Sequence, residues 1–342
     1  MNYDEFLRRV PKAELHCHVE GSIRPETAFE LARTNGVELP AANPDGLYRF
    51  DGFGEFEEIA VAVSSTLVDR DDFARIAYES LEDGVELGNL RYREMFFTPT
   101  LHTSRGIGYP TVVDGLCDGI REAERRLGVR CRLIADIQRQ DPPDVAVEMV
   151  RQVLAHRPDE VIGLGLDGAE AIDPPEQFVE AYRLAREGGL RLTAHACEDA
   201  PPVNITTCLD LLGCERIDHG YYVLDDERVL TRARDQGILF TVAPTATAIC
   251  YFTADLAAHP IRAMVERGLR VALNTDDPPM FATDLGSEYA LMCTAAGWGP
   301  DEVRQLCLNG VDGSWLDDGE RHDLRRTFER ELDELEAQLD RE

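Results

Sequence analysis

Short apolar runs alternate with amphipathic segments along almost the whole chain, and this alternation constrains the fold more than any other feature of the sequence. Such a pattern is typical of βαβ units arranged around a parallel sheet. The strand-like runs fall at residues 13–19, 90–97, 130–137, 161–168, 190–197, 215–222, 238–245 and 269–276. There are about eight of them, which is the number that a closed barrel requires. We therefore expect an α/β protein with the (β/α)₈ TIM-barrel architecture.

Helical periodicity fills the intervals between the predicted strands, and several of these segments end at a glycine, which suits a helix C-terminus. The clearest helical segments are 111–127, 145–155, 175–187, 227–236 and 260–267. The stretch 26–88 is helical in pattern throughout, and it is too long for one crossover. We expect it to hold the first barrel helix and, at about 40–88, a helical lid segment inserted after the first strand.

No linker interrupts the alternation, so we expect one domain over residues 1–342. Residues 321–342 are highly charged with leucines at helical spacing, and we expect helices at about 300–342 to cover the barrel from outside. Within the inserted segment, residues 50–68 carry the aromatic residues Phe53 and Phe56.

Charge and composition exclude several classes of function. The formal net charge of −30 opposes binding to nucleic-acid backbones and anionic membranes. No apolar run approaches the roughly 20 residues that span a bilayer, and the N-terminus does not resemble a secretory signal. The nine cysteines show no paired spacing, which indicates reduced thiols. We expect a cytoplasmic protein with a small-molecule ligand, and nothing in the sequence indicates its oligomeric state.

Histidine and aspartate residues gather where the predicted strands end. The residues at these ends are His16, His18, His195, His219, Asp276 and Asp277. In a barrel the carboxyl ends of the strands converge on one face, where active sites are built. Side chains two positions apart on a strand share a face, so the first two histidines can aim at one point.

Three imidazoles and one carboxylate form a ligand set for a divalent cation with an open position for water. Zinc suits such a set, while iron, cobalt and nickel stay open on ligand type alone. We expect no catalytic role for the histidines that fall in predicted loops or helices, His102, His156, His259 and His322. Among them His102 is the hardest to dismiss, because it follows the second predicted strand at the catalytic face.

The segments PKAELHCHVEGSIRPET, HACE, RIDHGYY and LNTDDPPMF resemble the adenosine deaminase family of the metal-dependent amidohydrolase superfamily in both order and spacing. The resemblance extends over nearly the whole chain. It implies a hydrolase that removes the 6-amino group of a purine as ammonia and holds one Zn²⁺ per chain. The zinc ligands that it implies are His16, His18, His195 and Asp276.

The resemblance also implies the catalytic groups. Glu198, three residues after the histidine of HACE, is implied to protonate the purine at N1, which requires a carboxyl group kept protonated by its surroundings. A water activated by the metal is implied to attack C6. His219 is implied to orient that water, and Asp276 to accept its proton.

Three further positions are implied to bind the substrate. Asp277 corresponds to the family position that hydrogen-bonds purine N7, and Gly168 to the position whose backbone N–H meets N3. Glu20 falls where members of the family contact the ribose hydroxyls.

Two departures from the family pattern bear on the substrate. Cys197 stands where the family usually has glycine, and we interpret its thiol as a packing group. The turn GLGLDGAE differs from the commoner DLAGDE, and Asp167 has no counterpart that we can assign.

Adenine deaminases of the family share a glutamate at the position of Glu20 and a GLD turn, whereas the segment TDDPPMFATDLGSEY is similar to the branches that act on nucleosides and on 6-amino-6-deoxyfutalosine. We favour adenosine or 2′-deoxyadenosine as the substrate, with adenine and 6-amino-6-deoxyfutalosine as alternatives. A catalytically inactive barrel that only binds a nucleoside is the alternative of another class.

Overall fold

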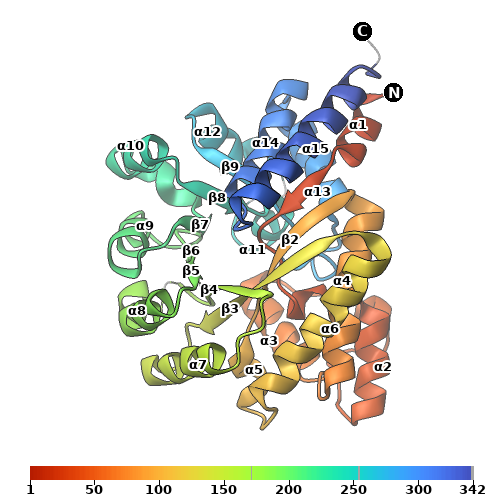
Figure 1. Cartoon of the computed structure of the whole chain (residues 1–342), viewed down its shortest axis with the longest axis vertical. Helices are drawn as coiled ribbons and strands as arrows, with labels where there is room; N and C mark the ends of the chain where they lie inside the picture. The colour runs from red at the N-terminus through yellow and green to blue at the C-terminus, as the bar shows by residue number, and fades with distance from the viewer. Residues whose placement is uncertain (171, 253–254, 340–342) are drawn as a thin grey trace.

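The computed structural model describes residues 1–170, 172–252 and 255–339. Its strands are all parallel and pair in two ladders, β1 to β5 and β6 to β9 (Figure 1). The strands are β1 (Lys12–Glu14), β2 (Leu90–Phe97), β3 (Arg130–Gln138), β4 (Val161–Asp167), β5 (Arg191–Leu192), β6 (His195–Ala196), β7 (Arg216–His219), β8 (Leu239–Val242) and β9 (Arg270–Leu273).

Backbone hydrogen bonds join the two ladders into a ring. Between β5 and β6, Thr193 N donates to Leu164 O at 3.0 Å, and Ala194 O accepts from Asp218 N at 2.9 Å, so the two short segments form one strand. At the other seam, His18 N donates to Asp276 O at 2.8 Å, beside a parallel bridge between Cys17 and Asp276. The predicted (β/α)₈ barrel is thereby confirmed.

Amphipathic helices surround the strands, and prolines begin several of them because the first helical position needs no N–H partner. The helices between consecutive barrel strands include α2 (Pro25–Asn35), α6 (Tyr109–Leu127), α7 (Pro143–Ala155), α8 (Val179–Glu187), α10 (Glu227–Gln236) and α12 (Pro260–Glu266). Predicted segment 175–187 begins with a short 3₁₀ turn before α8. Among the described residues, no helix combines the length and the apolar composition that crossing a membrane requires.

The inserted segment between α2 and β2 divides into two helices with different positions. Helix α3 (Gly52–Ser64) lies over the pocket described below, whereas α4 (Arg70–Gly88) packs alongside α6 in the outer layer (Figure 1). Gly119 on α6 permits this close packing, because a Cβ there would lie 2.1 Å from the carbonyl oxygen of Ala74. Of the two helices, α3 therefore lies at the pocket, and α4 belongs to the outer layer of helices.

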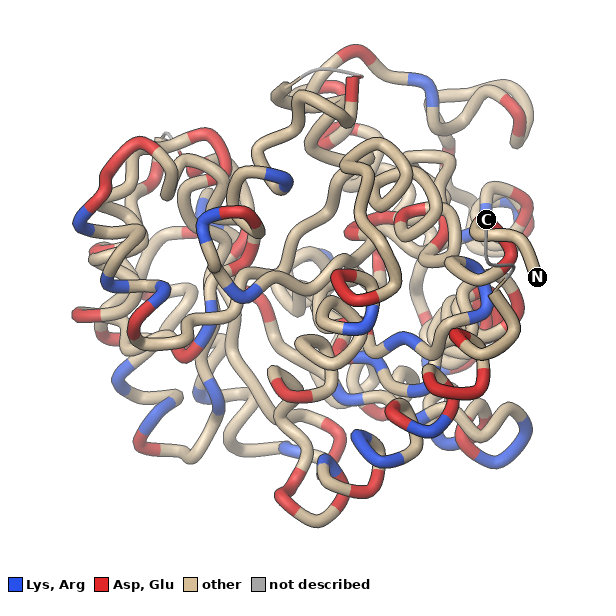
Figure 2. The backbone as a smooth tube through the Cα atoms, turned by 90° about the horizontal axis from the view of Figure 1, so that it is seen from above, with Lys and Arg blue, Asp and Glu red and all other residues tan. Residues whose placement is uncertain are grey.

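The C-terminal helices α14 (Pro300–Gly313) and α15 (Asp318–Glu336) pack on the outside of the barrel, beside the N-terminal helix α1 (Tyr3–Arg9) (Figure 1). Residues 340–342 of the expected C-terminal segment lie outside the described residues. Between α14 and α15, Trp315 approaches the barrel strands, where a Cβ on Gly163 would lie 2.5 Å from its ring. Acidic residues are distributed around the whole outline of the molecule and are interspersed with arginines (Figure 2).

Glu288 on helix α13 (Leu285–Ala296) is a fully buried carboxyl group that predicts a pH-dependent stability. It accepts hydrogen bonds from Thr283 Oγ1 at 2.6 Å and Thr245 N at 3.2 Å. Burial nevertheless raises its pKa to about 7 from an ordinary value of 4.5. The protonated form is favoured in the folded state, so this contribution to stability is present below the unfolded pKa and is lost as the pH rises through the folded pKa.

We therefore expect the free energy of unfolding of the unaltered protein to fall, relative to that of Glu288→Gln, by about 2 to 3 kcal/mol between about pH 5 and pH 8. Denaturant unfolding of both proteins across this range measures the difference. Parallel stability curves would contradict the assignment to Glu288.

Candidate active site

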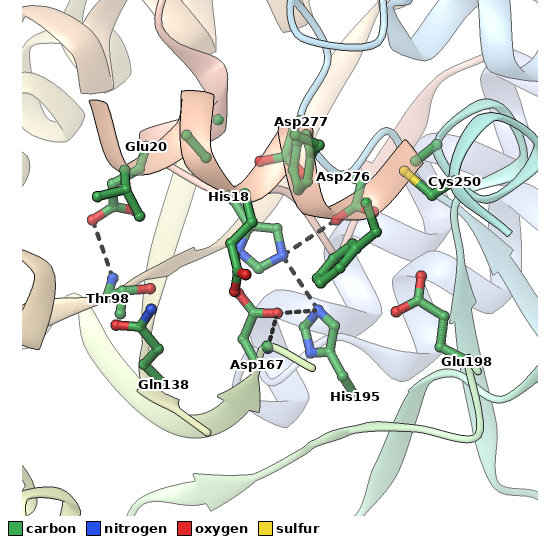
Figure 3. A pocket seen from close by; sticks show the side chains of 18 of the residues that line it. His18, Glu20, Thr98, Gln138, Asp167, His195, Glu198, Cys250, Asp276 and Asp277 are labelled. Carbon is green, nitrogen blue, oxygen red and sulfur yellow. Dashed lines mark hydrogen bonds and ion pairs between the residues drawn. The ribbon is translucent and has the colours of Figure 1, made fainter. Parts of the chain in front are cut away.

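A pocket opens at the carboxyl ends of the strands, with about 810 Å³ of atom-free space when its open mouth is counted. The polar residues that line it include His18, Glu20, Asp167, His195, Glu198, Asp276 and Asp277 (Figure 3). His219 also lines it. The strand ends thus bring together the residues singled out from the sequence; His16 lies buried directly beside this group.

The ring nitrogens of three histidines and the carboxylate of Asp276 lie close together. Asp276 Oδ1 lies 3.1 Å from His16 Nε2 and 3.2 Å from His18 Nε2, and His18 Nε2 lies 3.3 Å from His195 Nε2. His16 Nε2 is buried without a hydrogen-bond partner. Buried polar atoms without partners are costly, and a cation among these atoms would satisfy them. The arrangement therefore fits a divalent metal ion held by nitrogen and carboxylate ligands.

The same atoms fall into overlapping groups that could hold a metal. One comprises His16, His195, His219 and Asp276, and another comprises His18, Asp167 and His195. Asp167 is a residue that the sequence alone left unassigned. Its carboxylate oxygens lie 3.8 Å from His18 Nδ1 and 3.8 Å from His195 Nε2, so it adds negative charge directly beside the cluster.

Three site residues adopt a backbone conformation that non-glycine residues rarely adopt. Cys197, His219 and Asp276 have φ values of 64°, 66° and 67°. Such conformations cost about 1–3 kcal/mol each and cluster at functional sites. All three follow or end a barrel strand. The left-handed φ explains why the family position of Cys197 suits glycine.

The Cys197 thiol itself is buried and does not line the pocket, and burial raises its pKa. These observations support the interpretation of the thiol as a packing group.

A buried carboxylate lies beneath two of the histidines. Asp218 accepts hydrogen bonds at 2.7 Å from the hydroxyls of Thr193 and Thr241. Because the Thr241 hydroxyl donates to Asp218, its oxygen can accept from His16 Nδ1, 3.0 Å away. This fixes the proton on Nδ1 and leaves Nε2 free to bind a metal. Asp218 Oδ2 also lies 3.8 Å from His195 Nδ1.

Replacing Thr241 with valine is expected to weaken metal binding by about 10- to 100-fold, because the acceptor that orients His16 is removed at nearly constant volume. Competition with a chelator measures the metal affinity. Thr241→Ser keeps the hydroxyl and is expected to retain the unaltered affinity. Equal affinities for the valine and serine variants would show that the hydroxyl does not orient the ligand.

A second buried carboxylate, that of Asp136, lies near His18. Its Oδ2 is 3.8 Å from His18 Nδ1. Gly165 on the neighbouring strand makes room for it, since a Cβ there would lie 2.0 Å from Asp136 Oδ1. Both Asp136 and Asp218 fall within predicted strands, at 130–137 and 215–222, but nothing in the pattern distinguished them from core residues.

Glu198 lies across the pocket from Glu20, with Oε1 3.5 Å from His219 Nε2 (Figure 3). Burial, reinforced by the negative charge of Asp276, raises its pKa well above the ordinary range for a carboxyl group. The buried Glu170 fixes the adjoining backbone by accepting from Cys197 N at 2.7 Å and Glu198 N at 3.1 Å. The raised pKa favours the protonated form of Glu198, which is the form that a proton donor requires.

The three expected substrate contacts all line the pocket. Gly21 leaves space for Asp277, because a Cβ at position 21 would lie 1.5 Å from Asp277 Oδ1. Gly168 has a φ of 99°, and its N–H donates to Oδ1 of Asp167 at 2.5 Å. The contact of this N–H with purine N3 stays a prediction, and a substrate would compete with Asp167 for it.

Apolar residues of α3 close the pocket from above. Phe53 and Phe56 both line it, and Phe56 stacks on Phe281 with ring centroids 5.0 Å apart. Such a covering excludes water from the reacting groups.

Comparison with known proteins agrees with this geometry. The family described as "Adenosine deaminase" matches residues 11–330. The chain belongs to the adenosine deaminase family. An adenine deaminase from Caulobacter vibrioides is 36% identical over 320 residues, which are 93% of this chain and 92% of that protein.

Two solved structures extend the comparison. An amidohydrolase from Burkholderia ambifaria, solved with bound Zn, is 36% identical with a TM-score of 0.92, covering 98% of this chain and 94% of the other. An adenine deaminase from Arthrobacter aurescens is 33% identical with a TM-score of 0.90, covering 95% of this chain and 98% of the other. This member of the adenosine deaminase family is therefore a deaminase of the amidohydrolase type, with a site that fits a divalent metal.

Proposed function

We propose that this protein deaminates adenine, converting adenine and water to hypoxanthine and ammonia. The observation that carries the proposal is the likeness, over nearly the full length of both chains, to proteins named adenine deaminase. These relatives favour adenine over the adenosine that the segment TDDPPMFATDLGSEY led us to expect. Glu20, shared in type with adenine deaminases, agrees with this choice.

The chain's own residues supply the acid, the base and the orientation. Glu198 donates its proton to N1 of the ring, which makes C6 more electrophilic. His219 orients the attacking water, and Asp276 accepts the proton that the water loses and passes it to the departing amino group, so that the C6–N bond breaks and ammonia leaves. The proton that remains on the C6 oxygen returns to Glu198 as the C6=O bond of hypoxanthine forms. Asp277 forms a hydrogen bond with N7 and fixes the orientation of the purine ring in the pocket.

We propose zinc as the metal, held by His16, His18, His195 and Asp276, with one ion per chain. When bound, it would act as a Lewis acid that lowers the pKa of the attacking water. The likeness to a zinc-bound amidohydrolase supports this choice. Elemental analysis of protein purified without added metal is expected to give about one equivalent of zinc, and iron in its place would overturn the choice of metal.

A substrate panel on metal-replete protein tests the reaction. Adenine, adenosine, 2′-deoxyadenosine and 6-amino-6-deoxyfutalosine are each incubated with the protein, and released ammonia is measured. We expect the highest kcat/KM for adenine. A higher kcat/KM for adenosine or 2′-deoxyadenosine would instead indicate that the protein is a nucleoside deaminase. Binding without ammonia release from any of the four would indicate the inactive binding protein instead.

A further inference from the structure

Glu20 has one carboxylate oxygen held by the protein and one left free. Oε1 accepts hydrogen bonds from His102 Nε2 at 2.9 Å and from Thr98 N at 3.1 Å. Oε2 is buried without a partner, and Glu20 lines the pocket. A buried acceptor without a donor is costly, so this oxygen is suited to a donor that a ligand brings.

The hydrogen-bonding role of His102 follows from its other neighbour. His102 is fully buried after β2, and its Nδ1 lies 2.9 Å from Arg105 Nη2. A guanidinium group can only donate hydrogen bonds, so Nδ1 must accept. The ring hydrogen therefore lies on Nε2 and points at Glu20 Oε1. His102 thus fixes which oxygen of Glu20 is occupied.

Arg105 connects this pair to the lid. The two N–H groups of its Nη2 are shared among His102 Nδ1, Ser64 O at 3.1 Å and Leu67 O at 3.1 Å, and its Nη1 donates to Ser65 O at 2.9 Å. These carbonyls lie at the C-terminal end of α3, where the last helical carbonyls have no intrahelical partner and attract a cation. One side chain therefore joins the end of the lid helix to the group that holds Glu20.

We propose that His102 and Arg105 act as positioning residues that hold Glu20 so that its free oxygen selects a purine carrying a ring N–H on its imidazole side. This rests on the proposed deamination of adenine. Glu20 and Glu198 lie on opposite sides of the pocket (Figure 3), so a ring that meets Glu198 at N1 turns its five-membered ring toward Glu20.

The free base offers an N–H to the oxygen that lacks a partner, whereas a nucleoside carries a sugar carbon at N9 and has no proton there. A site built to pair with a substrate N–H rejects the analogue that lacks it by about 10⁴- to 10⁵-fold. Glu20, which the family resemblance assigned to ribose, would on this inference select against ribose.

Two substitutions of His102 provide the test. His102→Leu removes the donor, and we expect the KM for adenine to rise about 10- to 100-fold with kcat changed little, since the charge-assisted hydrogen bond that positions Glu20 is lost. The preference for adenine over adenosine should fall by a similar factor. His102→Gln can still donate an N–H to Glu20 and is expected to restore most of both values. Metal content should be the same in all three proteins.

A second variant leaves the buried histidine in place. In Glu20→Gln, His102 and Thr98 still require an oxygen at the Oε1 position, so the amide NH₂ faces the substrate and opposes a ring N–H. We expect adenine to lose far more kcat/KM than adenosine does. A purely structural role for Glu20 would lower both alike.

Arg105→Ala tests the connection to the lid. We expect a raised KM for adenine together with faster amide hydrogen exchange at residues 64–68. Arg121→Ala is the matched control, because Arg121 forms an ion pair with Glu160 on the outer surface with about half of its side chain exposed. It should change neither measurement.

The outcomes separate the two proposals. Absence of adenine deamination by the unaltered protein would overturn the proposed function itself. Normal adenine turnover combined with unchanged KM and unchanged preference in His102→Leu and Glu20→Gln would overturn only the inference about His102 and Arg105.

Discussion

Glu198→Gln is expected to lower kcat for deamination by about 10²- to 10⁴-fold, the range typical of a lost general acid. The amide has nearly the shape of the carboxyl group, but it cannot deliver a proton to the ring. Burial and the negative charge of Asp276 raise the pKa of Glu198 well above the ordinary range, which favours the protonated form that a proton donor needs. Steady-state kinetics with the best substrate of the panel measure the loss.

The matched control for this prediction is a neighbouring carboxyl group outside the pocket. Asp199→Asn changes the adjoining residue, which does not line the pocket, and should leave kcat within a few-fold. Metal content should match that of the unaltered protein in both variants. A Glu198→Gln variant with nearly full kcat would show that the ring is protonated by another group.

His16→Ala is expected to abolish metal retention after dialysis and to lower kcat/KM at least about 1,000-fold, because the metal's stabilisation of developing charge is worth several kcal/mol. His16 Nε2 is buried without a hydrogen-bond partner and lies 3.1 Å from Asp276 Oδ1, so we expect its removal to eliminate a ligand. Elemental analysis and kinetics are measured together.

His156→Ala is the control, since His156 is partly exposed and contacts Asp114 on the outer surface. It should retain both metal and activity. A His16→Ala variant that kept its metal would exclude His16 from the ligand set. Recovery of activity on adding excess metal would instead indicate a weakened site rather than a destroyed one.

The barrel could be predicted from the sequence because the pattern that indicates it is local. Alternation of apolar runs with amphipathic helices recurs along the chain, and each parallel strand needs a crossover before the next. The same logic placed the reactive groups: His16, His18, His195 and Asp276 stand at strand ends, and strand ends meet in a barrel. Periodicity could not separate α3 from α4, since both are amphipathic and only packing against α6 distinguishes the outer helix.

Residues that act through others were beyond the reach of the sequence. Three strand residues have the pattern of core positions, and only their distances to the histidines show another role: Asp136, Asp218 and Thr241. His102 was set aside because no local pattern connects a histidine on a short helix, α5 (Pro99–Thr103), to a glutamate 82 positions earlier. Asp167 had no assignable counterpart in the family pattern, and only the folded barrel shows that it lies beside His18.

The sequence by itself therefore determined the barrel and predicted which histidines and carboxylates gather at its strand ends, because strand periodicity and short motifs encode them within a few residues. Only the tertiary structure decided which side chains support that set and how Glu20 is oriented. Those contacts join residues of β3, β7 and β8 to the histidines that follow β1, and they join the end of α3 to the segment after β2. Contacts between segments far apart in the chain depend on how the ring closes, and no local pattern records that closure.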